Sequence, residues 1–312
     1  MNIPLATSLL RALLRTIEPS GAQKSAAAGS HRYVRQTLTN SAIGPRIVRT
    51  EGIGSYARKT AIAPIDDIDV LLVMDQDSWP RPIFMPYPDP AKVLADLQRS
   101  AKTGYPRSRV QRQRRSVGIV MARQSIDLVP ALPIDEKGTF VIPDRQDDDW
   151  IVTAPSTHTQ IVRALNADTS GLFVPTIKLL KHWNSTLPGT ANFRSIGIES
   201  IAGQLFRHHV PGSLEEAMLW FFDFVTHTSG LFGPDAVFHW PSRYGVSLTA
   251  LGPSAPDLSG LEGNVLSGLT VARTLKFVDK ARVARDRLER AADRPTKGNV
   301  TRQLGDLMKV DF

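Results

Sequence analysis

Asp67 and Asp69 stand one residue apart at the start of an apolar run, residues 70–74. Side chains two positions apart on a strand point to the same face, so we expect both carboxylates on one face. Burying them beside such a run is costly unless a cation neutralises them. Mg²⁺ prefers oxygen ligands: it usually binds one or two carboxylates and fills its remaining coordination positions with water and substrate phosphates. This pair therefore indicates a magnesium site for phosphate chemistry.

Two further features support a site for phosphate chemistry. Gly54-Ser55 lies just upstream and supplies backbone N–H groups and a hydroxyl where phosphates would bind. Asp127 lies inside a second apolar segment, residues 125–130. A lone carboxylate at a strand end is more commonly a cap or a surface group, but three on neighbouring strands can hold two cations for in-line phosphoryl or nucleotidyl displacement.

The elements that must position these residues follow from periodicity and from turn residues. Strands are expected over residues 46–50, 67–74, 117–121 and 125–130, and helices over residues 3–18, 23–39 and 90–102. From residue 156 onward the pattern is helical, with helices expected over residues 158–167, 174–184, 195–208, 214–228 and 271–292. Residues 137–149 are polar and turn-rich, and residues 233–258 are rich in Pro and Gly, which predicts loop with short extended pieces.

The length of 312 residues accommodates two lobes. We place their boundary near Trp150, so that residues 1–150 form the N-terminal helices and a catalytic lobe and residues 151–312 form a helical nucleotide-binding lobe. The segment before residue 36 is rich in Ala, Ser and Arg, as organelle transit peptides are. Its leucines have helical spacing, however, which favours an amphipathic helix packed on the body.

The net charge of +8 and the isoelectric point near 9.9 favour polyanionic partners, either nucleotides or nucleic acid. The sequence contains no cysteine, which excludes disulfides and cysteine-ligated zinc and is compatible with the cytoplasm. No apolar run is long enough to span a membrane. Five arginines lie within residues 107–115. They form either a solvated loop or a contact surface for phosphates of substrate or nucleic acid.

With these residues placed, the chain resembles the bacterial cGAS/DncV-like nucleotidyltransferases (CD-NTases) of the CBASS anti-phage system, a branch of the polymerase-β-like superfamily. The resemblance covers most of the chain. Its motifs are Gly54-Ser55 with Thr60, Asp67-Ile68-Asp69, Asp127 in Ile-Asp-Leu-Val-Pro, Trp150, Lys178-Leu-Leu-Lys181-His-Trp183, Ser195-Ile-Gly-Ile-Glu199 and the closing residues 304–312.

The resemblance implies an α/β (α+β) fold: a polymerase-β-like palm with a mixed sheet and the N-terminal helices packed on it, then a C-terminal helical lobe, with the active site in the cleft between them. It implies that Asp67, Asp69 and Asp127 bind two Mg²⁺ ions, with Mn²⁺ as an alternative, and that Asp127 also acts on the attacking hydroxyl. The implied triphosphate-binding residues are Gly54, Ser55, Thr60, Lys181 and Ser195.

Two positions depart from the family pattern. Lys59 stands where the family usually has Gly before the Thr, so the turn differs there, and Lys59 could add a phosphate contact. Ile196 follows Ser195 where an aromatic residue often stacks on a base. Tyr56 and Trp183 are alternatives for stacking, although we expect Trp183 to be a core residue of its helix.

The implied function is synthesis of a cyclic di- or trinucleotide from ATP, GTP or other nucleoside triphosphates, with release of pyrophosphate. The product would act on a separate effector, and a regulatory partner protein is compatible with this reading. The alternatives are a linear-product or protein nucleotidyltransferase, and an inactive nucleic-acid-binding module. Duplex DNA or RNA should not be required, because zinc sites for DNA sensing need Cys or His ligands at short spacing, and His208-His209 are adjacent residues of one predicted helix.

Overall fold

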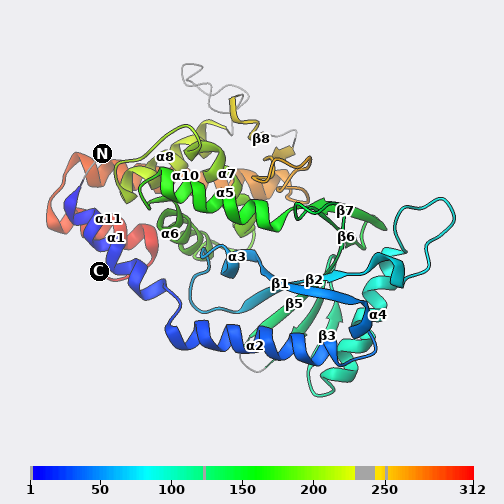
Figure 1. Ribbon diagram of the computed structural model, residues 1–312. Helices are drawn as coiled ribbons and strands as arrows, with labels where there is room; N and C mark the ends of the chain where they lie inside the picture. Colours follow the sequence, from blue (N-terminus) through cyan, green and yellow to red (C-terminus); the bar gives the residue numbers. More distant parts are fainter. Residues whose placement is uncertain (1–2, 122–123, 229–242, 250–251) are drawn as a thin grey trace. The chain divides into compact units, whose positions relative to one another are not determined.

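The computed structural model describes residues 3–121, 124–228, 243–249 and 252–312, and the chain divides into two compact units. One unit comprises Pro19–Thr159, which we call the sheet unit, and the other comprises Met1–Glu18 with Gln160–Phe312, which we call the helical unit. Both are labelled by element in Figure 1. Among the described helices, none combines the length and apolarity needed to cross a bilayer.

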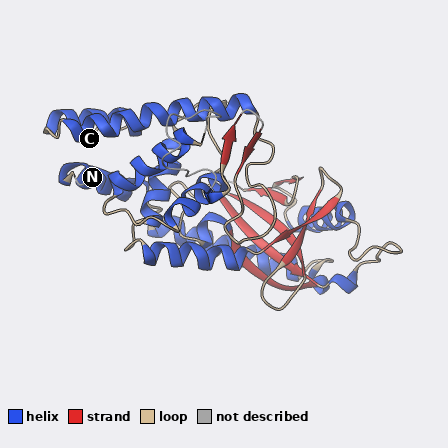
Figure 2. Cartoon of the chain, turned by 90° about the horizontal axis from the view of Figure 1, so that it is seen from above, coloured by secondary structure: helices blue, strands red, loops and turns tan. Residues whose placement is uncertain are grey.

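The sheet unit is built on a mixed sheet whose strands run in the order β1-β2-β5-β4-β3. The bounds are β1 Ile47–Ile53, β2 Asp67–Met74, β3 Arg109–Arg112, β4 Val117–Val120 and β5 Ser125–Pro133, with β6 Phe140–Asp144 and β7 Asp149–Thr153 extending from β5. The central strands β2 and β5 are parallel and the other pairs are antiparallel. The predicted mixed sheet is therefore confirmed, and Figure 2 shows its strands side by side with helix packed against them.

Two helices cover one face of this sheet: α2 (Gly21–Thr39) and α4 (Pro90–Gly104). A capping box between Ser20 and Gln23 begins α2, and Asp89 caps α4 by accepting from the N–H groups of residues 91 and 92. The even-numbered side chains of β2 pack on these helices, whereas Leu71 and Val73 belong to a second cluster with Phe140. Because both faces are buried, β2 reads as a continuous apolar run.

The helical unit contains α6 (Phe173–Ser185), α7 (Ser195–Phe206), α8 (Leu214–His227), α10 (Val271–Asp293) and α11 (Lys297–Met308). Its core includes four aromatic side chains, Trp183, Phe193, Phe222 and Phe277, with the rings of Phe193 and Phe277 stacked at 3.7 Å between centroids. Trp183 is buried, as expected for a core residue. The unit also contains a short ladder of β8 (Ser247–Thr249) and β9 (Gly252–Ser254).

The first helix, α1 (Pro4–Ile17), belongs to the helical unit, so the prediction that both N-terminal helices pack on the palm is wrong for this one. The buried carboxylate of Glu215 on α8 accepts from Ile3 N at 2.7 Å and from Thr7 Oγ1 at 2.8 Å. The apolar face of α1 is buried, as its helical spacing predicted. The unit boundary follows Thr159, inside α5 (Pro155–Asp168), rather than residue 150.

Two other segments differ from expectation, and a third is described in part. Residues 109–112 of the arginine run form strand β3 rather than loop. The polar residues 137–149 contain strand β6 and the start of β7, which alternation did not reveal because Pro143 and several carboxylates interrupt it. The sequence predicts loop with short extended pieces over residues 233–258. Residues 233–242 and 250–251 lie outside the described residues, and the remainder contains the three-residue strands β8 and β9, in agreement with that prediction.

Candidate active site

The three predicted carboxylates lie together at one end of the parallel pair β2 and β5. In this ladder Asp69 is the direct partner of Asp127, and Asp67 is the partner of Ser125. Strand alternation places Asp67, Asp69 and Asp127 on the face opposite to α2 and α4, since the neighbouring even-numbered residues pack on those helices. The sheet therefore joins residues 58 positions apart in the sequence, Asp69 and Asp127, into one acidic group.

The electrostatics of this group favour a cation. Burial raises the pKa of Asp69 to about 6, and repulsion from Asp127 adds to the increase, while Arg58 opposes it. Burial, followed by repulsion from Asp67, also raises the pKa of Asp127. Partly buried carboxylates that repel one another are the donor set that hard divalent cations bind.

The three carboxylates do not form a preformed metal site. In the described part of the chain, no three acidic or histidine side chains converge as a preformed metal site. Asp69 is directed toward Gly54, because a Cβ at residue 54 would lie 1.9 Å from Asp69 Oδ2. Asp127 Oδ1 accepts a hydrogen bond from Gln113 Nε2 at 2.9 Å. The residue types of this acidic group, three carboxylates, fit a divalent cation.

The Gly54-Ser55 turn lies beside these carboxylates, since β1 ends at Ile53, the ladder partner of Asp69. Gly54 has φ +72°, a left-handed conformation that suits glycine, and it begins the single-turn helix α3 (Gly54–Ala57). The carbonyl of Ser55 accepts from Thr60 N at 2.9 Å. Thr60 is fully buried and closes the turn through its backbone N–H, and its binding of triphosphate stays a prediction.

Lys59, the departure from the family pattern, also has a left-handed backbone, with φ +62°. Glycine, which the resemblance implies at this position, adopts this conformation without strain, whereas the exposed Lys59 adopts it at a cost. Tyr56, an alternative for base stacking, packs partly against the core of the sheet unit and donates its hydroxyl to Lys24 O at 3.1 Å.

Lys181 and Ser195 lie in the helical unit. The ammonium of Lys181 contacts the carboxylate of Glu199 on α7, and both side chains are buried. Lys178, one turn earlier on α6, contacts Glu18. Ser195 is the exposed first residue of α7. The binding of triphosphate by Lys181 and Ser195, and the cleft between the units, stay predictions.

Two contacts near the carboxylates were missed by the sequence analysis. Gln113 binds Asp127, as described above, and Arg114 and Arg115 form ion pairs with Asp144 at 2.7 and 2.8 Å. The arginine run stands out by its positive charge, but no sequence feature indicates that Gln113 within it contacts Asp127. At least these two arginines are engaged inside the fold rather than forming a solvated loop.

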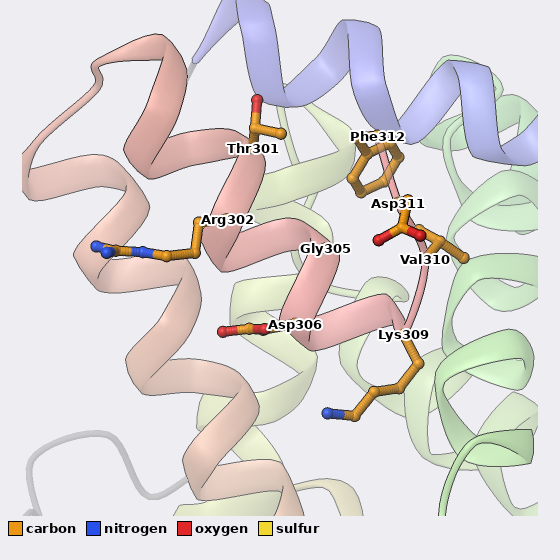
Figure 3. Close-up of a pocket in the computed structure, with 8 residues that line it drawn as sticks. All are labelled: Thr301, Arg302, Gly305, Asp306, Lys309, Val310, Asp311 and Phe312. Atoms are coloured by element: carbon orange, nitrogen blue, oxygen red, sulfur yellow. The ribbon is translucent and has the colours of Figure 1, made fainter.

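A hollow of about 530 Å³ lies elsewhere, at the end of α11, and contains none of the predicted site residues. Figure 3 shows Arg302 and Asp306 on one side of α11, away from Phe312. Asp306 forms an ion pair with Arg287 at 2.6 Å. The carboxylate of Asp306 is therefore already engaged within the helical unit.

Comparison with known proteins gives two relatives by sequence. A cyclic AMP-AMP-AMP synthase of Acinetobacter sp. is 31% identical over 173 residues, which cover 55% of this chain and 50% of that protein. A probable cyclic nucleotide synthase of Bacillus cereus is 24% identical over 163 residues, which cover 43% and 49%. The matches thus span about half the length of these relatives.

Solved structures match over nearly the whole chain. CdnC of E. coli MS115-1 with ATP has a TM-score of 0.73 at 18% identity, covering 99% of this chain and 98% of that one. The Vibrio cholerae DncV cyclic AMP-GMP synthase has a TM-score of 0.72 at 12% identity, covering 98% and 95%. At these identities the likeness shows the fold, and it confirms the α/β palm with a helical C-terminal part.

Residues 6–166, just over half of the chain, match the Second Messenger Oligonucleotide or Dinucleotide Synthetase (SMODS) domain. This segment contains the Gly54-Ser55 turn and all three carboxylates. The chain belongs to the SMODS family.

Proposed function

We propose that this protein is a nucleotidyltransferase that joins nucleoside triphosphates into a cyclic oligonucleotide second messenger. The observation that carries the proposal is the pairing of Asp69 with Asp127 across β2 and β5, with Asp67 on the same face and the Gly54 turn beside them. An acidic group next to a turn of backbone N–H groups suits the transfer of a phosphoryl-centred group.

In the proposed reaction a ribose hydroxyl of one nucleotide attacks the α-phosphorus of a nucleoside triphosphate. The new O–P bond replaces the bond to the β-phosphate oxygen, and pyrophosphate leaves. Asp127 accepts the proton of the attacking hydroxyl, while Gly54 and Ser55 hold the triphosphate. Two Mg²⁺ ions, or Mn²⁺, held by Asp67, Asp69 and Asp127 would stabilise charge on the attacking and leaving oxygens. A second round within the linear product closes the ring.

Substrates and partners follow from the relatives. Structures of CdnC with ATP and of the Bradyrhizobium diazoefficiens CdnG with GTP support ATP and GTP as substrates. A structure of a CdnC:HORMA-deltaN complex supports a regulatory protein partner. We therefore expect the same turnover with and without long duplex DNA or RNA, and a strict requirement for either duplex would contradict this.

The deciding experiment incubates the full chain with the four labelled nucleoside triphosphates and Mg²⁺, then treats the products with phosphatase before chromatography. A cyclic product has no terminal phosphate and survives unchanged, whereas a linear product shifts. Asp69→Asn should abolish product formation, and Asp66→Asn, the removal of an exposed neighbouring carboxylate, should not. Wild-type turnover by Asp69→Asn, or phosphatase-sensitive products alone, would overturn the proposal.

A further inference from the structure

The turn between β3 and β4, residues 113–116, brings an amide to the carboxylate of Asp127. Gln113 Nε2 donates to Asp127 Oδ1 at 2.9 Å, and Gln113 Oε1 accepts from Ser116 Oγ at 2.8 Å. The backbone closes the same turn, since Gln113 N donates to Ser116 O at 2.8 Å. Both ends of the amide are thus engaged, and its orientation is set from two sides.

Gly118 makes room for this contact. It is the β4 partner of Asp127 in the ladder, so its side-chain position lies next to the carboxylate. A Cβ at residue 118 would lie 2.6 Å from Gln113 Nε2 and 3.1 Å from Asp127 Oδ1. The bare backbone at this position is what allows the amide to reach across β4.

The other two residues of the turn anchor it to a different strand. Arg114 and Arg115 both bind Asp144, whose side chain is fully buried at the end of β6. In addition, Arg145 N donates to Arg114 O at 2.9 Å. The arginine run therefore fastens the turn to β6 and fixes the backbone from which Gln113 extends.

We propose that Gln113 is a positioning residue for Asp127. Its hydrogen bond occupies Oδ1 and thereby fixes the direction of Oδ2, the second oxygen available to the attacking hydroxyl or a cation. This inference rests on the proposed function, because it assigns Gln113 a task only if Asp127 takes part in the reaction. Groups that orient a ligating carboxylate contribute about 10- to 100-fold to activity or metal affinity.

The test compares Gln113→Leu with Gln98→Leu. The second variant is a matched control: Gln98 lies on α4, and its Nε2 donates to Val110 O of strand β3 at 3.4 Å, so it removes a glutamine hydrogen bond that does not involve Asp127. We expect Gln113→Leu to lower kcat about 10-fold with KM for the nucleotide within about twofold, because it disturbs the reacting carboxylate and not triphosphate binding. Gln113→Glu, of equal length, should not restore kcat, because its carboxylate repels Asp127.

A second measurement does not depend on turnover. Electron paramagnetic resonance of Mn²⁺ titrated with the full chain should show about 10-fold weaker binding for Gln113→Leu than for Gln98→Leu. Equal kcat and equal Mn²⁺ affinity in these two variants would overturn the positioning role while leaving the proposed function intact. Wild-type turnover by Asp127→Asn would instead overturn the proposed function and this inference with it.

Discussion

The buried carboxylate of Asp144 should make the stability of the sheet unit depend on pH. Burial alone would raise its pKa, but hydrogen bonds from Arg114 and Arg115 and from the backbone N–H of Gln146 outweigh burial and lower the pKa to about 2. The native state therefore favours the ionised carboxylate. Since the folded pKa lies below the unfolded value of 3.8, the stabilisation is present above about pH 4 and is lost as the pH falls toward about 2.

The size of the effect follows from the shift. At about 1.4 kcal/mol per pKa unit, lowering the pKa from 3.8 to about 2 corresponds to roughly 2 to 3 kcal/mol. The side chains of Arg114 and Arg115 are 31% and 39% exposed, so solvent screens the pairs. We therefore expect Asp144→Asn to lower the free energy of unfolding by about 1 kcal/mol at neutral pH.

Urea unfolding of wild type and Asp144→Asn across pH measures this difference directly. It should fall to about half of its neutral value near pH 3, roughly midway between the two pKa values, because the carboxyl of the unfolded state is then mostly protonated. Asp147→Asn is the matched control: Asp147 also binds Arg114, but it is 58% exposed and should contribute less than about 0.5 kcal/mol. A difference between wild type and Asp144→Asn that stays constant down to about pH 3 would refute the reasoning.

Substitutions at three further positions test the site and the turn beside it. Gly54→Ala should destabilise the fold by about 1 kcal/mol through its left-handed backbone, and it should reduce turnover at least about 10-fold because the new Cβ displaces the Asp69 carboxylate; unchanged kinetics would contradict this. Lys59→Gly should raise the free energy of unfolding by up to about 1 kcal/mol by relieving a left-handed conformation, while Lys59→Ala should not; thermal unfolding distinguishes them, and a less stable glycine variant would show that the strain is absent. Lys181→Ala should raise the KM for nucleotide more than it lowers kcat, because we expect the ammonium to bind the triphosphate equally in the ground and transition states. It should also lower the free energy of unfolding by about 3 kcal/mol, because it leaves the buried carboxylate of Glu199 without this cation. An unchanged KM with a lowered unfolding midpoint would show that Lys181 serves the fold alone.

Local pattern was sufficient for the elements that carry the site. The one-residue spacing of Asp67 and Asp69 placed both on one face of a strand, and the apolar residues after them predicted that this strand is buried. Local pattern also placed Asp127 in its own strand and a turn at Gly54-Ser55, whereas the left-handed backbone of Gly54 was seen only in the structure. These properties depend on a few consecutive residues, whose side chains alternate by backbone geometry alone.

Contacts between distant residues depended on strand register and on packing, which periodicity does not encode. The parallel register of β2 and β5 places Asp69 opposite Asp127, and the pairing of β4 with β5 places a glycine where Gln113 must pass. Glu215, far along the chain, accepts hydrogen bonds from the start of α1 and thereby holds this helix in the helical unit. A pattern of charges shows that a segment is polar, but the partner of each charge depends on which strands and helices pack together. A register shift of one residue would move every side chain of a strand to the opposite face of the sheet, and so would change all of these partners.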